Sequence, residues 1–255
     1  MKKFVILLTL FVSLGAASAW ATSACPDVST SLTTYLATGF SCEIGDKIFS
    51  NFSYSSTSMG GALALGSGAV DVETLGSLSG TDPAEFANAN IGLAFDAGWA
   101  ASATCFGMTC TGAETDSKIG FVVTVIGGAN MAITDAAVAE TSGGASGAGS
   151  SASVSEGGCS GAPCTTSQWG VLSFITPGNY TNAASETMFS ATGSVQVLKD
   201  ITVTAAGVIN GEATLSEVQD TFSQSPTSVP EPATMALAGA ALCGIAVVRR
   251  RRAAK

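Results

Sequence analysis

Asp71 and Glu73 have the residue types and the spacing needed for acid–base chemistry. They alternate with Val70 and Val72, so a β-strand here places both carboxyl groups on one face. Two carboxyl groups at this order of separation can act as the acid and the base or nucleophile of a glycoside hydrolase. Two acids on one strand are also the usual solvated face of a half-buried strand, and the sequence favours that simpler interpretation.

Other catalytic arrangements are missing from the sequence. The chain contains no histidine, and no arginine precedes Arg249, which excludes Ser-His-Asp and Cys-His arrangements and bidentate clamps for phosphate. No serine stands three residues before a lysine between Thr22 and Glu231, and no P-loop, dinucleotide or calcium-loop motif is present. The sequence therefore predicts a protein that is not an enzyme.

Two aromatic residues are candidates for ligand binding. Trp99 and Tyr180 occur in segments that contain Gly or Asn, where an exposed ring could stack on a sugar. The alternative is packing in the core or at its rim, which is the commoner role of large rings. A carbohydrate-binding or calcium-dependent adhesion module is thus an alternative to a structural role.

Cysteines point to an oxidising compartment. One of them, Cys243, lies in a C-terminal apolar segment, and six precede it: Cys25, Cys42, Cys105, Cys110, Cys159 and Cys164. An even set in an exported chain predicts disulfides, and the repeated short spacing favours the pairs 105–110 and 159–164, with 25–42 as the third. A zinc site formed by the two closely spaced pairs is the alternative, but oxidation and the absence of histidine disfavour it.

The N-terminus has the three parts of a secretory signal peptide. Lys2 and Lys3 precede an apolar run over residues 4–14, and Ala19 and Ala21 form an Ala-x-Ala cleavage site. We expect residues 1–21 to be removed, with cleavage after Ala19 as the alternative. A second permanent membrane helix is disfavoured because the apolar run is short.

Residues 229–255 also have three parts. A turn formed by Val229, Pro230, Glu231 and Pro232 precedes an uncharged segment over residues 233–248, and Arg249, Arg250, Arg251 and Arg252 follow it. A helix over this segment would extend about 24 Å, which is shorter than the hydrocarbon core of about 30 Å. The length of the segment therefore predicts a marginal transmembrane span. The positive-inside rule keeps the arginines and the rest of the tail, residues 249–255, in the cytoplasm and the preceding domain outside.

This order of parts resembles the PEP-CTERM sorting segment of bacterial envelope proteins. The resemblance covers residues 230–255, and looser matches at 42–54 and 197–203 suggest an all-β body without implying an activity. It implies that a membrane-embedded exosortase recognises the Pro-Glu-Pro motif and cleaves near it. The product would then be released or attached at the cell surface, where extracellular polysaccharide is a possible partner.

The segment between the two ends is strongly acidic. Three lysines and nineteen acidic residues between Thr22 and Glu231 give a net charge of −16. This balance excludes nucleic acid as a partner, because no basic patch is available to neutralise phosphate. Solubility is the simpler explanation of the charge, calcium binding is the more specific one, and no other cofactor is expected.

Alternation of apolar and polar residues predicts an all-β domain over residues 22–222. The clearest alternation spans 195–205, where Lys199 interrupts the apolar face, and shorter ones occur at 70–73 and 91–95. Residues 121–126 are apolar except for Thr124, a run typical of a strand covered on both faces. Turn-rich spacers between these runs favour an antiparallel β-sandwich of the jelly-roll kind.

Three segments carry a weaker signal. Residues 142–158 are almost all Gly, Ala or Ser and are expected to form a flexible loop, because they can bury little apolar surface. Residues 223–229 are expected to be a polar linker to the sorting segment. Residues 214–222 fit either a capped helix or a closing strand.

The function that follows is an exported, exosortase-sorted envelope protein with a non-catalytic structural or matrix role. A carbohydrate- or calcium-dependent adhesion module and a glycoside hydrolase are the alternatives.

Overall fold

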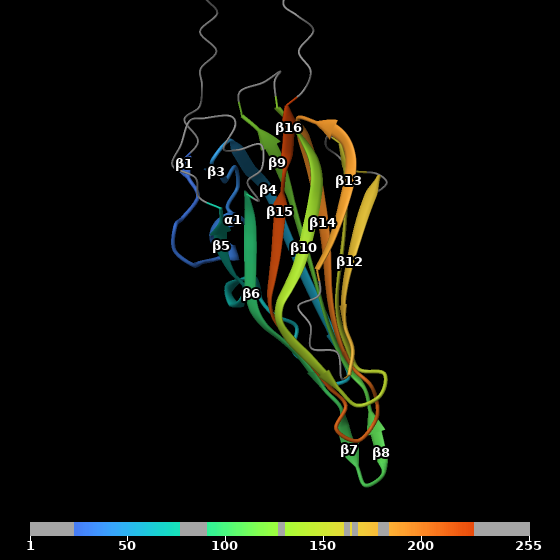
Figure 1. The fold of residues 1–255 in the computed structure, drawn as a ribbon. Helices are drawn as coiled ribbons and strands as arrows, with labels where there is room; N and C mark the ends of the chain where they lie inside the picture. The colour runs from blue at the N-terminus through green and yellow to red at the C-terminus, as the bar shows by residue number, and fades with distance from the viewer. Residues whose placement is uncertain are drawn as a thin grey trace, which may run out of the picture.

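The computed structural model describes residues 23–76, 91–126, 131–160, 164, 168–177 and 184–226. These residues form two large β-sheets that face each other, and a small hairpin at one end (Figure 1). A single helical turn, α1 (Leu32–Tyr35), and a 3-10 turn at Ser67–Ala69 lie near the N-terminal side. The prediction of an all-β fold is confirmed.

The first sheet has the strand order β1-β3-β4-β9-β14-β11-β12. Its strands are β1 (Ser23–Ala24), β3 (Ser41–Ile44), β4 (Lys47–Met59), β9 (Ala113–Val125), β14 (Ser194–Ala205), β11 (Ser151–Ser160) and β12 (Trp169–Ile175). Every pair is antiparallel except β1 with β3.

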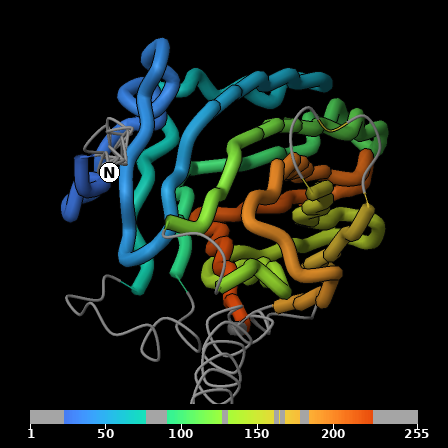
Figure 2. Tube along the Cα trace, turned by 90° about the horizontal axis from the view of Figure 1, so that it is seen from above, coloured from blue at the N-terminus to red at the C-terminus, as the bar shows by residue number. Residues whose placement is uncertain are grey.

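The second sheet has the order β13-β10-β15-β6-β5-β2, with β16 also paired to β10. Its strands are β13 (Ala184–Thr192), β10 (Met131–Ser146), β15 (Glu212–Phe222), β6 (Ile91–Ser102), β5 (Asp71–Leu75), β2 (Thr30–Ser31) and β16 (Gln224–Pro226). The hairpin of β7 (Thr104–Phe106) and β8 (Thr109–Thr111) projects from the end of the molecule. The N-terminal strands lie at one edge of the two layers and β12 and β13 at the other (Figure 2).

The strand pairs are nested in the sequence. Counting β6 and β9 to β15 as eight strands, the first pairs with the last (β6 with β15), and then β9 pairs with β14, β10 with β13 and β11 with β12. Most successive strands in this set lie in opposite sheets. The nesting brings β11 close to β14 and β15, although β11 is distant from both in sequence.

Alternation along β14 determines what faces the core. Val195, Val197, Ile201 and Val203 are fully buried on one face, as their parity predicts. The same parity carries Lys199 into the core, where it is 2% exposed. The apolar run beginning at Phe121 lies in β9, between β4 and β14, and Phe121 packs against rings that include Phe222 of the opposite sheet.

The prediction of a flexible loop over residues 142–158 is wrong. β10 extends to Ser146, only a short turn follows, and β11 begins at Ser151 and lies between β14 and β12. Ladder hydrogen bonds on both sides supply the stabilisation that small side chains do not. The glycines permit close packing here, since a Cβ on Gly158 would come within 2.2 Å of the Trp169 ring.

The two other segments with a weak secondary-structure signal in the sequence also belong to sheets. Residues 214–222 form part of the strand β15, which resolves the choice between helix and strand. The prediction of a polar linker over residues 223–229 is wrong for the first part of that segment, because β16 pairs with β10 and Gln224 is buried. The backbone hydrogen bonds available along β10 explain why this polar segment is ordered.

The signal peptide at 1–21, the sorting motif, the helix expected over 233–248 and the basic tail lie outside the described residues. Within the described part of the chain, no helix has the length and hydropathy required to cross a bilayer.

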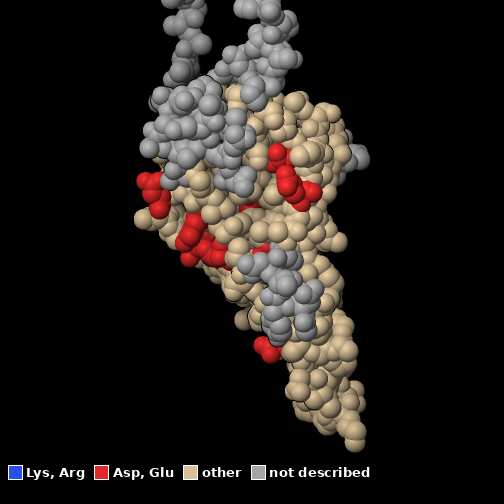
Figure 3. Space-filling model, in the orientation of Figure 1, with Lys and Arg blue, Asp and Glu red and all other residues tan. Residues whose placement is uncertain are grey.

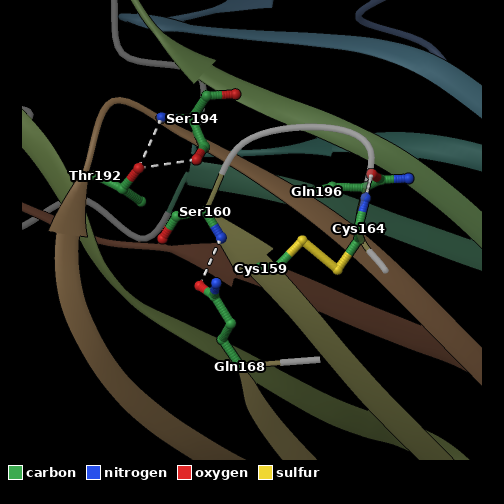
Figure 4. The surroundings of a disulfide bond; sticks show 7 residues. All are labelled: Cys159, Ser160, Cys164, Gln168, Thr192, Ser194 and Gln196. Carbon is green, nitrogen blue, oxygen red and sulfur yellow. Dashed lines mark hydrogen bonds between the residues drawn. A yellow bond between two sulfur atoms is a disulfide. The ribbon is translucent and has the colours of Figure 1, made fainter. Parts of the chain in front are cut away.

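All three favoured disulfides are present in the structure. Cys25–Cys42 ties the residue that follows β1 to β3, and Cys105–Cys110 joins the two strands of the β7–β8 hairpin. Cys159–Cys164 lies at the end of β11, where the Cys164 backbone N–H donates to Gln196 Oε1 at 2.7 Å (Figure 4).

The disulfides are predicted to differ in their contribution to stability. Replacing Cys25 and Cys42 with alanine should lower the free energy of unfolding by about 3 kcal/mol, because a longer loop loses more entropy on closure. Replacing Cys105 and Cys110 should cost about 2 kcal/mol. Chemical denaturation of the two variants measures both values, and a larger loss for the hairpin pair would contradict this ranking.

Candidate functional site

Four ionisable side chains meet in the core between the sheets. We call Glu140, Glu156, Lys199 and Asp220 the buried charge cluster. Lys199 Nζ donates to Glu156 Oε2 at 2.8 Å and also to Asp220 Oδ1, and none of these three side chains is exposed. Glu140 is 1% exposed.

Strand register explains how the cluster assembles. Glu156 of β11 and Lys199 of β14 are direct cross-strand partners in the first sheet. Asp220 comes from β15 of the second sheet and reaches across the core to the same amine. Apolar residues of the same strands flank these side chains and exclude water: Val154, Val197, Ile201, Val218 and Phe222 are all fully buried.

Burial and mutual repulsion shift the ionisation of the cluster. Desolvation raises the pKa of Asp220 well above its ordinary value, and the Glu156 carboxylate raises it further. Desolvation lowers the pKa of Lys199, but attraction to Asp220 and Glu156 outweighs it, and the net direction is upward. Burial therefore favours the protonated form of Asp220, and the two neighbouring acidic side chains favour the charged form of Lys199.

Glu140 makes stability depend on pH. Burial raises its pKa from 4.5 to about 7, although the Val154 backbone, Ser173 and Lys199 oppose the shift. The folded state holds this proton more tightly than the unfolded chain, so stability should fall as pH rises from about 4.5 to about 7. Asp220 acts in the same direction.

Thermal melts of the wild type and of the Glu140→Gln variant at pH 5 and pH 8 test this prediction. We expect the wild type to melt at a lower temperature at pH 8, and the variant to show a smaller difference between the two pH values. Equal pH dependence in the two proteins would contradict the assignment to Glu140.

The outer face of the first sheet carries a hollow of about 490 Å³, which we call the outer hollow. A cross-strand row forms its floor, and the register joins Ser53, Gly120, Leu198, Gly157 and Gly170 in that order across five strands. The three glycines leave room that larger side chains would occupy. Leu198 is 43% exposed and contributes an apolar surface in the middle of the row.

Polar groups line one side of the outer hollow. Ser55 and Ser155 add hydroxyl groups, and Lys118 lies 3.0 Å from an Asp200 carboxylate oxygen. Lys118 also lies 3.7 Å from an Asp116 carboxylate oxygen. Burial and the neighbouring Asp200 raise the pKa of Asp116, while Lys118 lowers it. This combination of small, apolar and charged groups can bind a small polar ligand through hydrogen bonds.

Asp71 and Glu73 lie on one exposed face of β5, as predicted. Asp96 and Glu217 are close to them, and burial, followed by repulsion from Glu217, Glu73 and Asp71, raises the pKa of Asp96. Acidic side chains gather on the face of the second sheet shown in Figure 3, without a basic side chain among them. In the described residues, no group of three or more His, Cys, Asp or Glu side chains has the arrangement of a metal site.

The ligand-stacking role considered for Trp99 is wrong. Trp99 is fully buried in β6, and its Nε1 donates to Ser117 Oγ at 3.1 Å. Its segment forms a long strand against β15, so the ring faces the core rather than solvent. Tyr180 lies outside the described residues.

The buried charge cluster was not predicted from the sequence, although a signal for it was present. Lys199 interrupts the apolar face of its strand, and Asp220 stands between Val218 and Phe222 on the same parity. A charged residue on the buried parity of a strand requires a partner of opposite charge. The sequence could not identify which of nineteen acidic residues supplies it.

Comparisons with known proteins identify the C-terminal segment. Residues 228–252 match the family model described as the PEP-CTERM protein-sorting motif, which implies an exported protein sorted by an exosortase. The chain therefore carries a PEP-CTERM protein-sorting motif at its C-terminal end. The match includes Val229, the Pro-Glu-Pro residues and the four arginines.

Two further comparisons are less informative. No curated protein matches the chain. Among solved structures, the enzymatically active domain of bacteriophage CBA120 tailspike protein 4 is similar at 11% identity and a TM-score of 0.26. The match covers 70% of this chain and only 20% of the tailspike chain.

Proposed function

We propose that this protein is a non-catalytic structural component of the bacterial cell surface or extracellular matrix. The observation that carries the proposal is a sorting motif attached to an all-β body with three disulfides. An exosortase would remove the membrane-anchored tail, and the acidic body would remain outside with surface polysaccharide as a partner. The nested strand pairs support a β-sandwich of the jelly-roll kind as the form of this body.

Fractionation of the producing cells tests this role. We expect the processed body in the extracellular matrix fraction, and a gene deletion should alter the amount or cohesion of that matrix without removing a hydrolytic activity. Recovery of the processed body only as a free protein in the medium, with an unchanged matrix, would contradict the proposal.

A glycan-binding module is the second candidate, and the outer hollow favours it. A glycan-binding screen should compare the wild type with a Gly170→Gln variant, whose longer side chain would enter the hollow. A Cβ at Gly170 comes no closer than 3.4 Å to Glu156 O, so the variant should fold. Equal glycan binding by both proteins would exclude the hollow as the site.

A further inference from the structure

Lys199, Asp220 and Glu156 place three reactive groups in contact. The Lys199 amine is hydrogen-bonded to the Asp220 carboxyl group from the opposite sheet. Glu156 Oε2 lies 2.8 Å from the same nitrogen. The contact therefore joins a nucleophile (the Lys199 amine), a carbonyl carbon next to it (Asp220 Cγ) and a proton acceptor (the Glu156 carboxylate).

The surroundings favour condensation over an ion pair. No part of the three side chains is exposed, and the apolar residues that flank them on the same strands (Val154, Val197, Ile201, Val218 and Phe222) are fully buried. Separated charges are costly in such a place, whereas an amide is neutral. Burial raises the pKa of Asp220 and so favours its protonated form, whose Cγ is a better electrophile than a carboxylate carbon.

We propose that Lys199 and Asp220 form an intramolecular isopeptide bond that covalently joins the two sheets, with Glu156 as the proton acceptor. Glu156 first takes a proton from the Lys199 ammonium group. The neutral amine then attacks Asp220 Cγ, the N–C bond forms and the C–O bond to the hydroxyl group breaks. That hydroxyl group leaves as water with a second proton from the nitrogen.

The reaction balances without an oxidant or cofactor. It begins with one positive charge on Lys199 and one negative charge on Glu156, and ends with a neutral amide, a water molecule and a protonated Glu156. The buried cluster thereby loses both charges. The product links β14 to β15, which strengthens an extracellular domain in the way a disulfide does, but it is insensitive to reductant.

The distribution of basic residues permits a direct test. Lys118 and Lys199 are the only basic residues between position 48 and Arg249, so trypsin has only two cleavage sites there. The test uses the full chain as produced by the cell, denatured, reduced and digested. Without a cross-link, trypsin releases a free peptide of residues 119–199, whose ends do not depend on signal or sorting cleavage.

With the isopeptide bond, trypsin cannot cleave after Lys199. We expect a single fragment that begins at Ile119, continues beyond Asp220, and has a mass lower by one water than its sequence requires. Fragmentation should place the modification on Lys199 and Asp220. Full recovery of the free 119–199 peptide from the wild type would overturn the proposal.

Three variants separate the roles. Lys199→Arg retains a tryptic site but cannot form the amide, so the free peptide should appear. Asp220→Asn should still form the bond with loss of ammonia, and Glu156→Gln should leave most of the protein uncross-linked. A Glu156→Gln variant as fully cross-linked as the wild type would remove Glu156 from the reaction, and a cross-linked Lys199→Arg variant would exclude Lys199.

Discussion

Replacing Lys199 with methionine is expected to lower the free energy of unfolding by about 3–5 kcal/mol. Methionine fills a similar volume but removes the cation that contacts both Glu156 and Asp220 in a water-excluded core. Two carboxyl groups then share the site without a positive charge, and any covalent link through Lys199 is lost as well. Urea denaturation followed by intrinsic fluorescence measures the loss.

Lys118 provides the matched control for this prediction. It also pairs with carboxylates on strands of the first sheet, at 3.0 Å and 3.7 Å, but it is exposed on the outer face. Exposed ion pairs contribute little to stability, so a Lys118→Met variant should unfold at the same urea concentration as the wild type. Equal losses from the two lysine variants would show that burial of the Lys199 cluster has no energetic consequence.

Disruption of the Pro-Glu-Pro motif is expected to abolish most of the sorting. A variant with Glu231→Ala and glycine in place of Pro230 and Pro232 should accumulate as an uncleaved precursor in the inner membrane. The motif is the proposed recognition element, whereas residues 233–248 and the arginines would still insert and orient the chain. Immunoblots of membrane, surface and medium fractions distinguish the precursor from the processed form.

Thr227→Ala is a suitable control because Thr227 immediately precedes the matched segment of residues 228–252. This variant should be processed like the wild type. Normal release of the Pro-Glu-Pro variant would show that exosortase recognition depends on another part of the tail.

Features that depend on local spacing could be predicted from the sequence. The sorting motif is contiguous, and its family is identified from residues 228–252 alone. The disulfides 105–110 and 159–164 join cysteines that are close in sequence, so chain connectivity itself favours their pairing. The period-2 alternation over 195–205 likewise predicted the strand β14, because side-chain direction in a strand follows from parity.

Features that depend on distant partners were decided only by the tertiary structure. Residues 142–158 have little hydrophobicity of their own, and they became ordered because β14 and β12 supply hydrogen-bond partners on both edges of β11. Trp99 was buried because its segment extends a strand against β15. Lys199, Glu156 and Asp220 meet because nested pairing across two sheets brings β11, β14 and β15 together, and no local pattern encodes which acidic residue the buried amine will contact.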